Sequence, residues 1–432
     1  MNIPFIPVLL ISHLVAAVLG AAGTRALVIN KNRDTNRGVV FGSTVGLVGG
    51  LIALFLFWLF VAFLVTTRTQ AHLEAGTEPP LVQLKIRLPD WAPKNISFRR
   101  ILLRLRAFIA LILLFGFFSI YSPDAFLKSD NLVILTKQVA LNAIMGIGMT
   151  FVILTAGIDL SIGSIVGLCG MVAGALIREG VRIEAFDMVI YWNVWILGLI
   201  TIGVGMLLGL FNGLVITRFN VAPFIVTLGT LYSARGLALL INDGATYKQL
   251  GDPKLGNPDF IRLGTDTDPW FDLPYSIWIM IGLVIIAVFV TTKTPFGRQT
   301  YAIGGNARAA ELSGVRVKRT TTLAYVISGF CAAIVGLIVT SQLRSAHPAN
   351  GEFWELQVIA AVVLGGTSLA GGRGTILGTV IGAFVIGVLR NGMLLNDVSS
   401  FWQQVITGLV IVIAVIIDQL SQRLEERTML SA

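Results

Sequence analysis

The chain has 432 residues, of which 55% are hydrophobic and 13% are charged, and its formal net charge is +9. A soluble domain carries about 25% charged residues, whereas many apolar stretches of this chain approach the roughly 20 residues that cross a bilayer as a helix. These features exclude a soluble globular protein and predict an all-α, polytopic helical membrane protein, without the short alternating segments of a transmembrane β-barrel.

The sequence also lacks the motifs of several catalytic and cofactor sites. Cys169 and Cys331 lie in apolar runs without a CxxC or a neighbouring histidine, so neither a disulfide nor a metal site is predicted. No HExxH, GxSxG or GxxxxGK(S/T) motif occurs. We therefore predict no catalytic residue, no bound cofactor and no ATP hydrolysis by this chain alone. The positive charge gathers in loops beside apolar runs, which indicates membrane orientation and contact with lipids rather than nucleic-acid binding.

The first 106 residues contain two apolar runs and a basic segment. Runs 3–24 and 38–66 predict an N-terminal membrane hairpin over residues 1–66, with the basic residues after it in the cytoplasm. Alternatively, the first run lies in the membrane interface. Residues 67–106 are predicted to form a basic cytoplasmic linker, because four prolines oppose a long helix. The linker ends in SFRRILLRLRAF, a pattern typical of an interfacial helix on anionic lipid.

Residues 107–418 predict about ten core transmembrane segments, and several short, glycine-rich runs indicate broken or re-entrant helices. The runs are 107–120, 135–156, 161–177, 188–216, 222–241, 276–292, 320–343, 356–370, 376–395 and 401–418. Residues 242–275 carry six aspartates against three basic residues, whereas residues 293–319 carry six basic residues against one glutamate. We therefore expect the acidic loop outside, and the basic segment and the tail, residues 419–432, in the cytoplasm.

Polar residues interrupt the apolar runs at several places. In TAGIDLSIGS, Asp159 or Ser161 caps a helix that begins near Ile162, or the segment lines a substrate pathway, and these two readings are compatible. Asn212 either hydrogen-bonds across helices or lines the same path. LGGTSLAGGRGT, residues 364–375, is a second interruption, and the glycines that follow it along one run indicate close helix packing. The candidate pathway residues are Asn142, Asp159, Ser161, Ser164, Asn212, Thr227, Thr230, Thr367 and Ser368.

The basic segment, residues 293–319, contains an alanine-rich stretch. Residues 306–312 favour a short helix, with Gly304 and Gly305 before it and Gly314 after it, where glycine suits helix ends. The segment is either a solvated cytoplasmic loop or the place where a soluble partner contacts the membrane protein.

Four stretches of the chain carry a resemblance to known proteins: LNAIMGIGMTFVILTAGIDLSIGSIVGL, FNVAPFIVTLGTLYSARG, TPFGRQTYAIGGNARAAELSGVRV and IAAVVLGGTSLAGGRGTILGTVIGAF. In these stretches, and in their order, the chain resembles the permease subunits of bacterial ATP-binding-cassette sugar importers of the ribose, xylose and arabinose type. The resemblance covers residues 107–418. It implies a multi-pass transport subunit of the bacterial inner membrane that is not an enzyme and moves a monosaccharide by alternating access.

The resemblance also implies the partners of the chain. They are cytoplasmic ATPase subunits that bind ATP and Mg²⁺, a periplasmic or lipid-anchored sugar-binding protein, and a second permease copy in a homodimer or a related heterodimer. Typical members lack a counterpart of residues 1–106. The segment expected to dock on the ATPase contains Gly305, Asn306, Arg308, Ala309, Ala310, Glu311, Gly314 and Val315.

Two other classes of function fit the sequence less well. A secondary, ion-coupled carrier of a small polar solute would need paired acids or bases within the membrane, and Asp159 is the one strong candidate in the sequence. An intramembrane enzyme is disfavoured because no catalytic motif is present.

Overall fold

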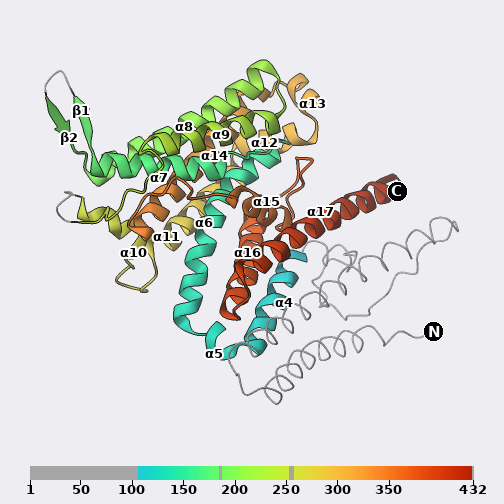
Figure 1. Ribbon diagram of the computed structural model, residues 1–432. Coiled ribbons are helices and arrows are strands. Elements are labelled where there is room, and N and C mark those ends of the chain that lie inside the picture. Colours follow the sequence, from blue (N-terminus) through green and yellow to red (C-terminus); the bar gives the residue numbers. More distant parts are fainter. Residues whose placement is uncertain (1–105, 184–186, 253–256, 431–432) are drawn as a thin grey trace, which may run out of the picture.

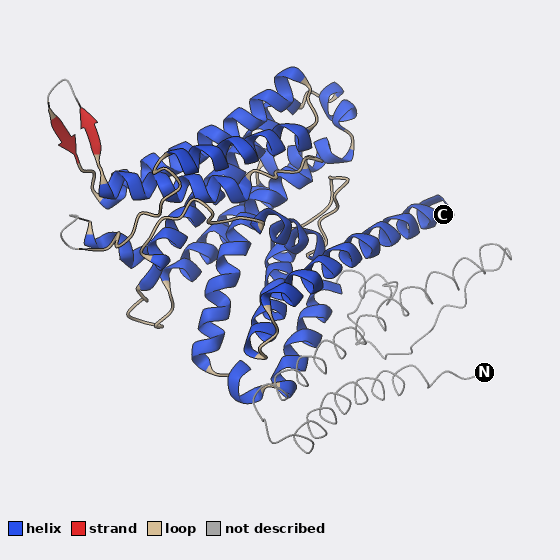
Figure 2. Ribbon diagram, in the orientation of Figure 1, coloured by secondary structure: helices blue, strands red, loops and turns tan. Residues whose placement is uncertain are grey.

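The structure, a computed structural model, describes residues 106–183, 187–252 and 257–430. The predicted N-terminal hairpin, basic linker and interfacial helix lie outside these residues. Among the described residues, the regular secondary structure is helical apart from one antiparallel hairpin, β1 (Val181–Ile183) and β2 (Met188–Ile190) (Figure 2). The helices are α4 (Arg106–Tyr121), α5 (Pro123–Phe126), α6 (Ser129–Leu154), α7 (Ile162–Arg178), α8 (Val194–Phe219), α9 (Pro223–Leu240), the 3₁₀-helix η3 (Pro258–Ile261), α10 (Arg262–Thr265), α11 (Tyr275–Lys293), α12 (Pro295–Gly305), α13 (Ala307–Leu312), α14 (Val317–Leu343), α15 (Trp354–Leu364), α16 (Ile376–Leu395) and α17 (Ser400–Leu430).

Each of the ten predicted core runs contains a helix. Within the described ranges, six helices are long and apolar enough to cross a membrane: α6, α8, α9, α11, α14 and α16. α4, α7, α15 and the first part of α17 are apolar but shorter. α15 has 11 residues, so its length of about 16 Å is less than the hydrocarbon core of about 30 Å. The structure therefore confirms the predicted polytopic helical membrane protein.

Glycine contacts bring the central helices together. α14 lies at the centre and packs against α6, α7 and α8 (Figure 1). A Cβ atom on Gly209 of α8 would lie 2.2 Å from the carbonyl oxygen of Tyr325 on α14, so no larger residue fits without movement. On α16, a Cβ atom on Gly382 would lie 1.9 Å from the carbonyl oxygen of Ala361 on α15. This contact confirms the close packing predicted for the glycine-rich run.

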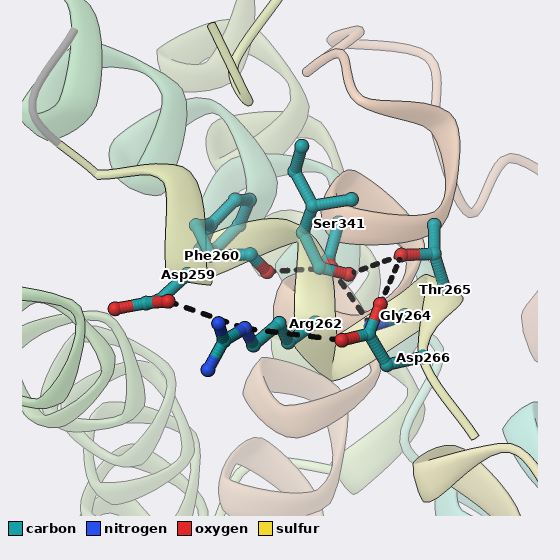
Figure 3. A network of polar contacts seen from close by, with 8 residues as sticks. Asp259, Phe260, Arg262, Gly264, Thr265, Asp266 and Ser341 are labelled. Carbon is teal, nitrogen blue, oxygen red and sulfur yellow. Dashed lines mark hydrogen bonds and ion pairs between the residues drawn. The ribbon is translucent and has the colours of Figure 1, made fainter. Parts of the chain in front are cut away.

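The acidic loop and the basic segment lie at opposite ends of the layer formed by α8, α9 and α14, as their charges predicted (Figure 1). The acidic loop is anchored to the end of α14, where the Ser341 hydroxyl accepts a hydrogen bond of 2.8 Å from the amide of Gly264 (Figure 3). Beside it, the Arg262 guanidinium lies 3.2 Å from an oxygen of Asp259 and 3.9 Å from one of Asp266. The bond to Ser341 holds this part of the loop against α14, and the ion pairs join residues within the loop.

The basic segment is mostly helical, which sequence analysis did not predict beyond its short alanine-rich stretch. α12 begins directly after α11: the Thr294 hydroxyl accepts a hydrogen bond of 3.3 Å from the amide of Gly297, and Pro295 occupies the first turn. α12 consists mainly of small and polar residues, a composition typical of loops, so the sequence did not predict it as a helix. α12 therefore forms a helical link from α11 to α13.

Candidate functional site

The break between α6 and α7 is the first part of the site. α6 ends at Leu154, and α7 begins at Ile162, where the sequence predicted a helix start. Ala156 has a φ of 61°, an uncommon value for a residue with a side chain. A Cβ atom on the next residue, Gly157, would lie 2.4 Å from the Tyr325 hydroxyl. Backbone conformation and packing thus both fix the path of this segment.

Asp159 is the central polar residue of the break, and its side chain is fully buried. One carboxylate oxygen accepts hydrogen bonds from the Ser161 amide at 2.9 Å and the Ser161 hydroxyl at 2.6 Å. The other accepts a bond of 2.7 Å from the Ser328 hydroxyl on α14. Asp159 therefore ties the start of α7 to α14. Ser161 occupies the N-cap position of α7, but its side chain bonds to Asp159 rather than capping the helix.

The network continues from Ser161 into two further helices. The Asn212 amide on α8 donates a hydrogen bond of 2.9 Å to the Ser161 hydroxyl. Its oxygen accepts one of 2.5 Å from the Thr230 hydroxyl on α9. Thr227, one turn earlier on α9, lies with its hydroxyl 3.2 Å from the carbonyl oxygen of Ile158. The structure thus joins four of the nine predicted pathway residues, Asp159, Ser161, Asn212 and Thr230, by side-chain hydrogen bonds, and Thr227 bonds to the backbone beside them.

The other four candidates lie outside this chain of side-chain bonds. The Ser164 hydroxyl donates to the Ser161 carbonyl oxygen within the first turn of α7. Asn142 is half-buried on α6. Thr367 and Ser368 lie in the break between α15 and α16, and the Thr367 hydroxyl is buried without a hydrogen-bond partner among the described residues.

Sequence analysis missed three polar residues near this region. Ser328 lies on the long apolar α14, where nothing in the sequence singles out one serine as the partner of Asp159. Glu355 is buried in the first turn of α15. Arg235 on α9 donates hydrogen bonds to the carbonyl oxygens of Pro348 and Asn350, at 3.0 Å for Asn350. Glu355 and Arg235 were detectable, because ionisable residues in or beside apolar runs are uncommon and usually paired.

The predicted docking segment contains the expected short helix, α13. The Asn306 side chain caps it by accepting a hydrogen bond of 3.0 Å from the Ala309 amide. At its other end, Gly314 has a φ of 84°, and the Val315 amide donates to the carbonyl oxygen of Ala310. Capping at both ends stabilises a helix of only six residues.

The surface of α13 is suited to contact with another protein. Leu312 is 76% exposed, although it is a large apolar residue in a polar setting. Arg308 and Glu311 form an ion pair of 2.6 Å on the same surface. Arg316, Lys318 and Arg319, just beyond the helix, are exposed as well. The helix therefore presents an apolar tip among charged residues, of predominantly positive sign.

Comparisons with known proteins point in one direction. The family model described as branched-chain amino acid transport system / permease component matches residues 131–415. The chain is 45% identical to the ribose import permease protein of Bacillus subtilis, over 76% of this chain and 96% of that protein. It is 40% identical to the Haemophilus influenzae ribose import permease protein, over 75% and 95% of the two chains. Identity to the xylose transport system permease protein of Escherichia coli is 33%, over 74% and 93%. No solved structure matches the chain.

Proposed function

The chain belongs to the branched-chain amino acid transport system / permease component family, among the permeases of sugar importers, and we propose that separate ATPase subunits drive it to move a monosaccharide across the bacterial inner membrane. The sugar would pass by alternating access after delivery by an extracytoplasmic binding protein, and a second permease chain would complete the pathway. The observation that carries this proposal is the capped, exposed helix α13, in a chain that aligns with nearly the whole of the ribose import permease proteins.

We propose that α13 and its flanking residues dock on the ATPase. A short, doubly capped helix with an exposed apolar tip fits a pocket on a soluble partner, because apolar residues at the centre of a contact supply most of its binding free energy. The proposed contact residues are the eight predicted from the sequence: Gly305, Asn306, Arg308, Ala309, Ala310, Glu311, Gly314 and Val315. We add Leu312, because its side chain is exposed on the same short helix.

The polar network around Asp159 supports a role in the translocation path. Its serine, threonine and asparagine side chains have the neutral donors and acceptors that sugar hydroxyls require. Its members are buried, and side-chain hydrogen bonds join Asp159 to Ser161, Ser161 to Asn212 and Asn212 to Thr230. We propose that the network holds the helix break in this state, and that the path opens beside it when the helices move.

Co-purification tests the class of the protein. The tagged chain is solubilised in mild detergent and mixed with the purified cytoplasmic ATPase of its own system. We expect a stable complex that also forms without sugar. If the ATPase does not bind, while the chain alone carries sugar across vesicle membranes, the importer assignment is wrong and the ion-coupled carrier is favoured.

A further inference from the structure

The last turn of α12 contacts both breaks in the membrane helices. A Cβ atom on Gly304 would lie 2.0 Å from the carbonyl oxygen of Leu154, where α6 ends. It would also lie 2.2 Å from the amide nitrogen of Gly372, in the break between α15 and α16. These two groups are themselves bonded, because the Gly372 amide donates to the Leu154 carbonyl at 3.1 Å. Three backbone segments therefore meet at one point, which we call the Gly304 junction.

Further contacts along α12 reinforce the Gly304 junction. The Tyr301 hydroxyl donates a hydrogen bond of 2.8 Å to the carbonyl oxygen of Gly374, in the second break. At the start of α12, the ring of Phe296 lies 5.7 Å from that of Phe151 on α6, measured between ring centroids. Tyr301 thus connects α12 to the break between α15 and α16, and Phe296 connects it to α6. α12 is thus held against the breaks along its length.

The backbone at the junction has unusual conformations. Ala156, Gly371 and Gly372 have φ values of 61°, 87° and 70°. A Cβ atom on Gly371 would lie 2.9 Å from that of Ala156, so the two breaks also touch each other directly. A contact made of tightly packed backbone changes by switching between discrete arrangements rather than by gradual deformation.

We propose that Gly304 is a positioning residue for coupling: it passes the displacement of α13 to both membrane breaks at once. This inference rests on the proposed function, since it takes α13 as the helix that the ATPase moves. Only Gly305 and Asn306 separate Gly304 from α13, and α12 is a continuous helix, so a displacement at α13 reaches the junction with little slack. The junction then shifts the end of α6 and the start of the α15–α16 break together.

The test measures the coupling between sugar uptake and ATP hydrolysis. The Gly304→Ala chain and the wild-type chain are assembled with the ATPase and the sugar-binding protein in proteoliposomes, with labelled ribose and xylose as probes. We expect Gly304→Ala to retain ATPase binding and ATP hydrolysis, while sugar uptake per ATP falls about tenfold, within the usual range of coupling between sites. Gly282→Ala is the matched control, because an added methyl group there meets nothing within 4 Å.

A second variant guards against poor folding of the first. Tyr301→Phe removes one hydrogen bond without changing the packing, and we expect uptake per ATP to fall by about fivefold, at the low end of that range. Tyr232→Phe, on an exposed side chain of α9, is its control. The proposal is overturned if Tyr301→Phe keeps the wild-type ratio of uptake to ATP hydrolysis and Gly304→Ala, where it folds, keeps it as well. It is also overturned if Gly304→Ala fails because the ATPase no longer binds. Failure of the wild-type chain to bind the ATPase or transport sugar would instead reject the proposed function.

Discussion

Asp159 shows how one residue can hold a broken membrane helix in place. Its carboxylate receives three hydrogen bonds, from the amide and hydroxyl of Ser161 and the hydroxyl of Ser328. The sequence identified Asp159 as exceptional because a carboxylate between apolar runs is costly unless it is bonded. It did not identify Ser328, since the choice among the hydroxyl residues of α14 depends on which face of that helix meets the break.

Replacing Asp159 by alanine should destabilise the protein. Asp159→Ala leaves three buried donors without an acceptor, and each buried unsatisfied group costs about 1–3 kcal/mol. The unfolding temperature in detergent should be clearly lower than that of the wild-type protein, and sugar uptake should be reduced. Asp124→Ala, at an exposed position on α5, is the control and should unfold like the wild-type protein. Unchanged stability and uptake of Asp159→Ala would contradict both roles given to this residue.

Asp268, in the acidic loop, should remain ionised to unusually low pH. Burial raises the pKa of this carboxyl, but hydrogen bonds from the Trp278 indole and the amides of Phe271, Trp270 and Leu273 outweigh that effect and lower it. Because the folded-state pKa is depressed, the contribution to stability is present above the unfolded value of about 3.9 and is lost as pH falls through the folded value.

A fluorescence titration of the tryptophans checks this expectation. The wild-type protein should show a transition below about pH 3.9, the ordinary value for aspartate. Asp268→Asn should lack it. The same transition in both proteins would show that another group controls the signal.

At the scale of single elements, the sequence predicted the core helices but not α12, the helix that connects α11 to α13. Long apolar runs predicted the core helices, because a membrane span needs a sustained apolar stretch. α12 was missed because it is short and not apolar overall: its buried residues are Gly297, Thr300 and Ile303, and these form no long apolar run. The contacts that give this helix its place, at Leu154 and Gly372, involve backbone atoms, and residue types alone do not reveal them.

The close contact between α8 and α14 can be tested with one methyl group. Gly209→Ala places a Cβ atom 2.2 Å from the carbonyl oxygen of Tyr325, and such overpacking costs about 1–3 kcal/mol. Gly203→Ala, on the same helix, adds a methyl group that meets nothing within 4 Å. In detergent, denaturation should occur at a lower temperature for Gly209→Ala and not for Gly203→Ala. Equal stability of the two variants would contradict the described packing.

Changes in α13 should uncouple transport without unfolding the chain. Glu311→Arg breaks an exposed ion pair, which contributes only about 0–1 kcal/mol to stability. Gly314→Asp strains a backbone whose φ of 84° favours glycine, although its side chain would meet open space. Uptake and ATPase co-purification should both fall in the two variants.

Asp187→Arg is the matched control for Glu311→Arg. It removes an exposed aspartate that pairs with Arg182 in the hairpin, at the opposite end of the molecule. This variant should bind the ATPase normally. Normal uptake and ATPase binding by Glu311→Arg and Gly314→Asp would remove α13 from the docking surface.

At the scale of the whole molecule, the two ends and the middle have separate tasks in the proposed cycle. The acidic loop lies at one end, the basic segment that contains α13 at the other, and the polar network with its helix breaks between them. Large apolar side chains remain exposed on α8, α9, α11 and α17, for lipid or a second permease chain to cover. The charges of the loops and the lengths of the apolar runs predicted where these parts lie. The contact of both helix breaks with Gly304 could not be predicted, because it is made by backbone atoms of the folded chain.

Dependence on ATP is the most direct test of the account. The chain is reconstituted in proteoliposomes with its ATPase and sugar-binding protein, and uptake of labelled ribose and xylose is measured with ATP supplied to the ATPase side. We predict that uptake requires all three proteins and ATP, and continues when ionophores abolish the proton and sodium gradients. Uptake by the chain alone, driven by an ion gradient and indifferent to ATP, would contradict the account.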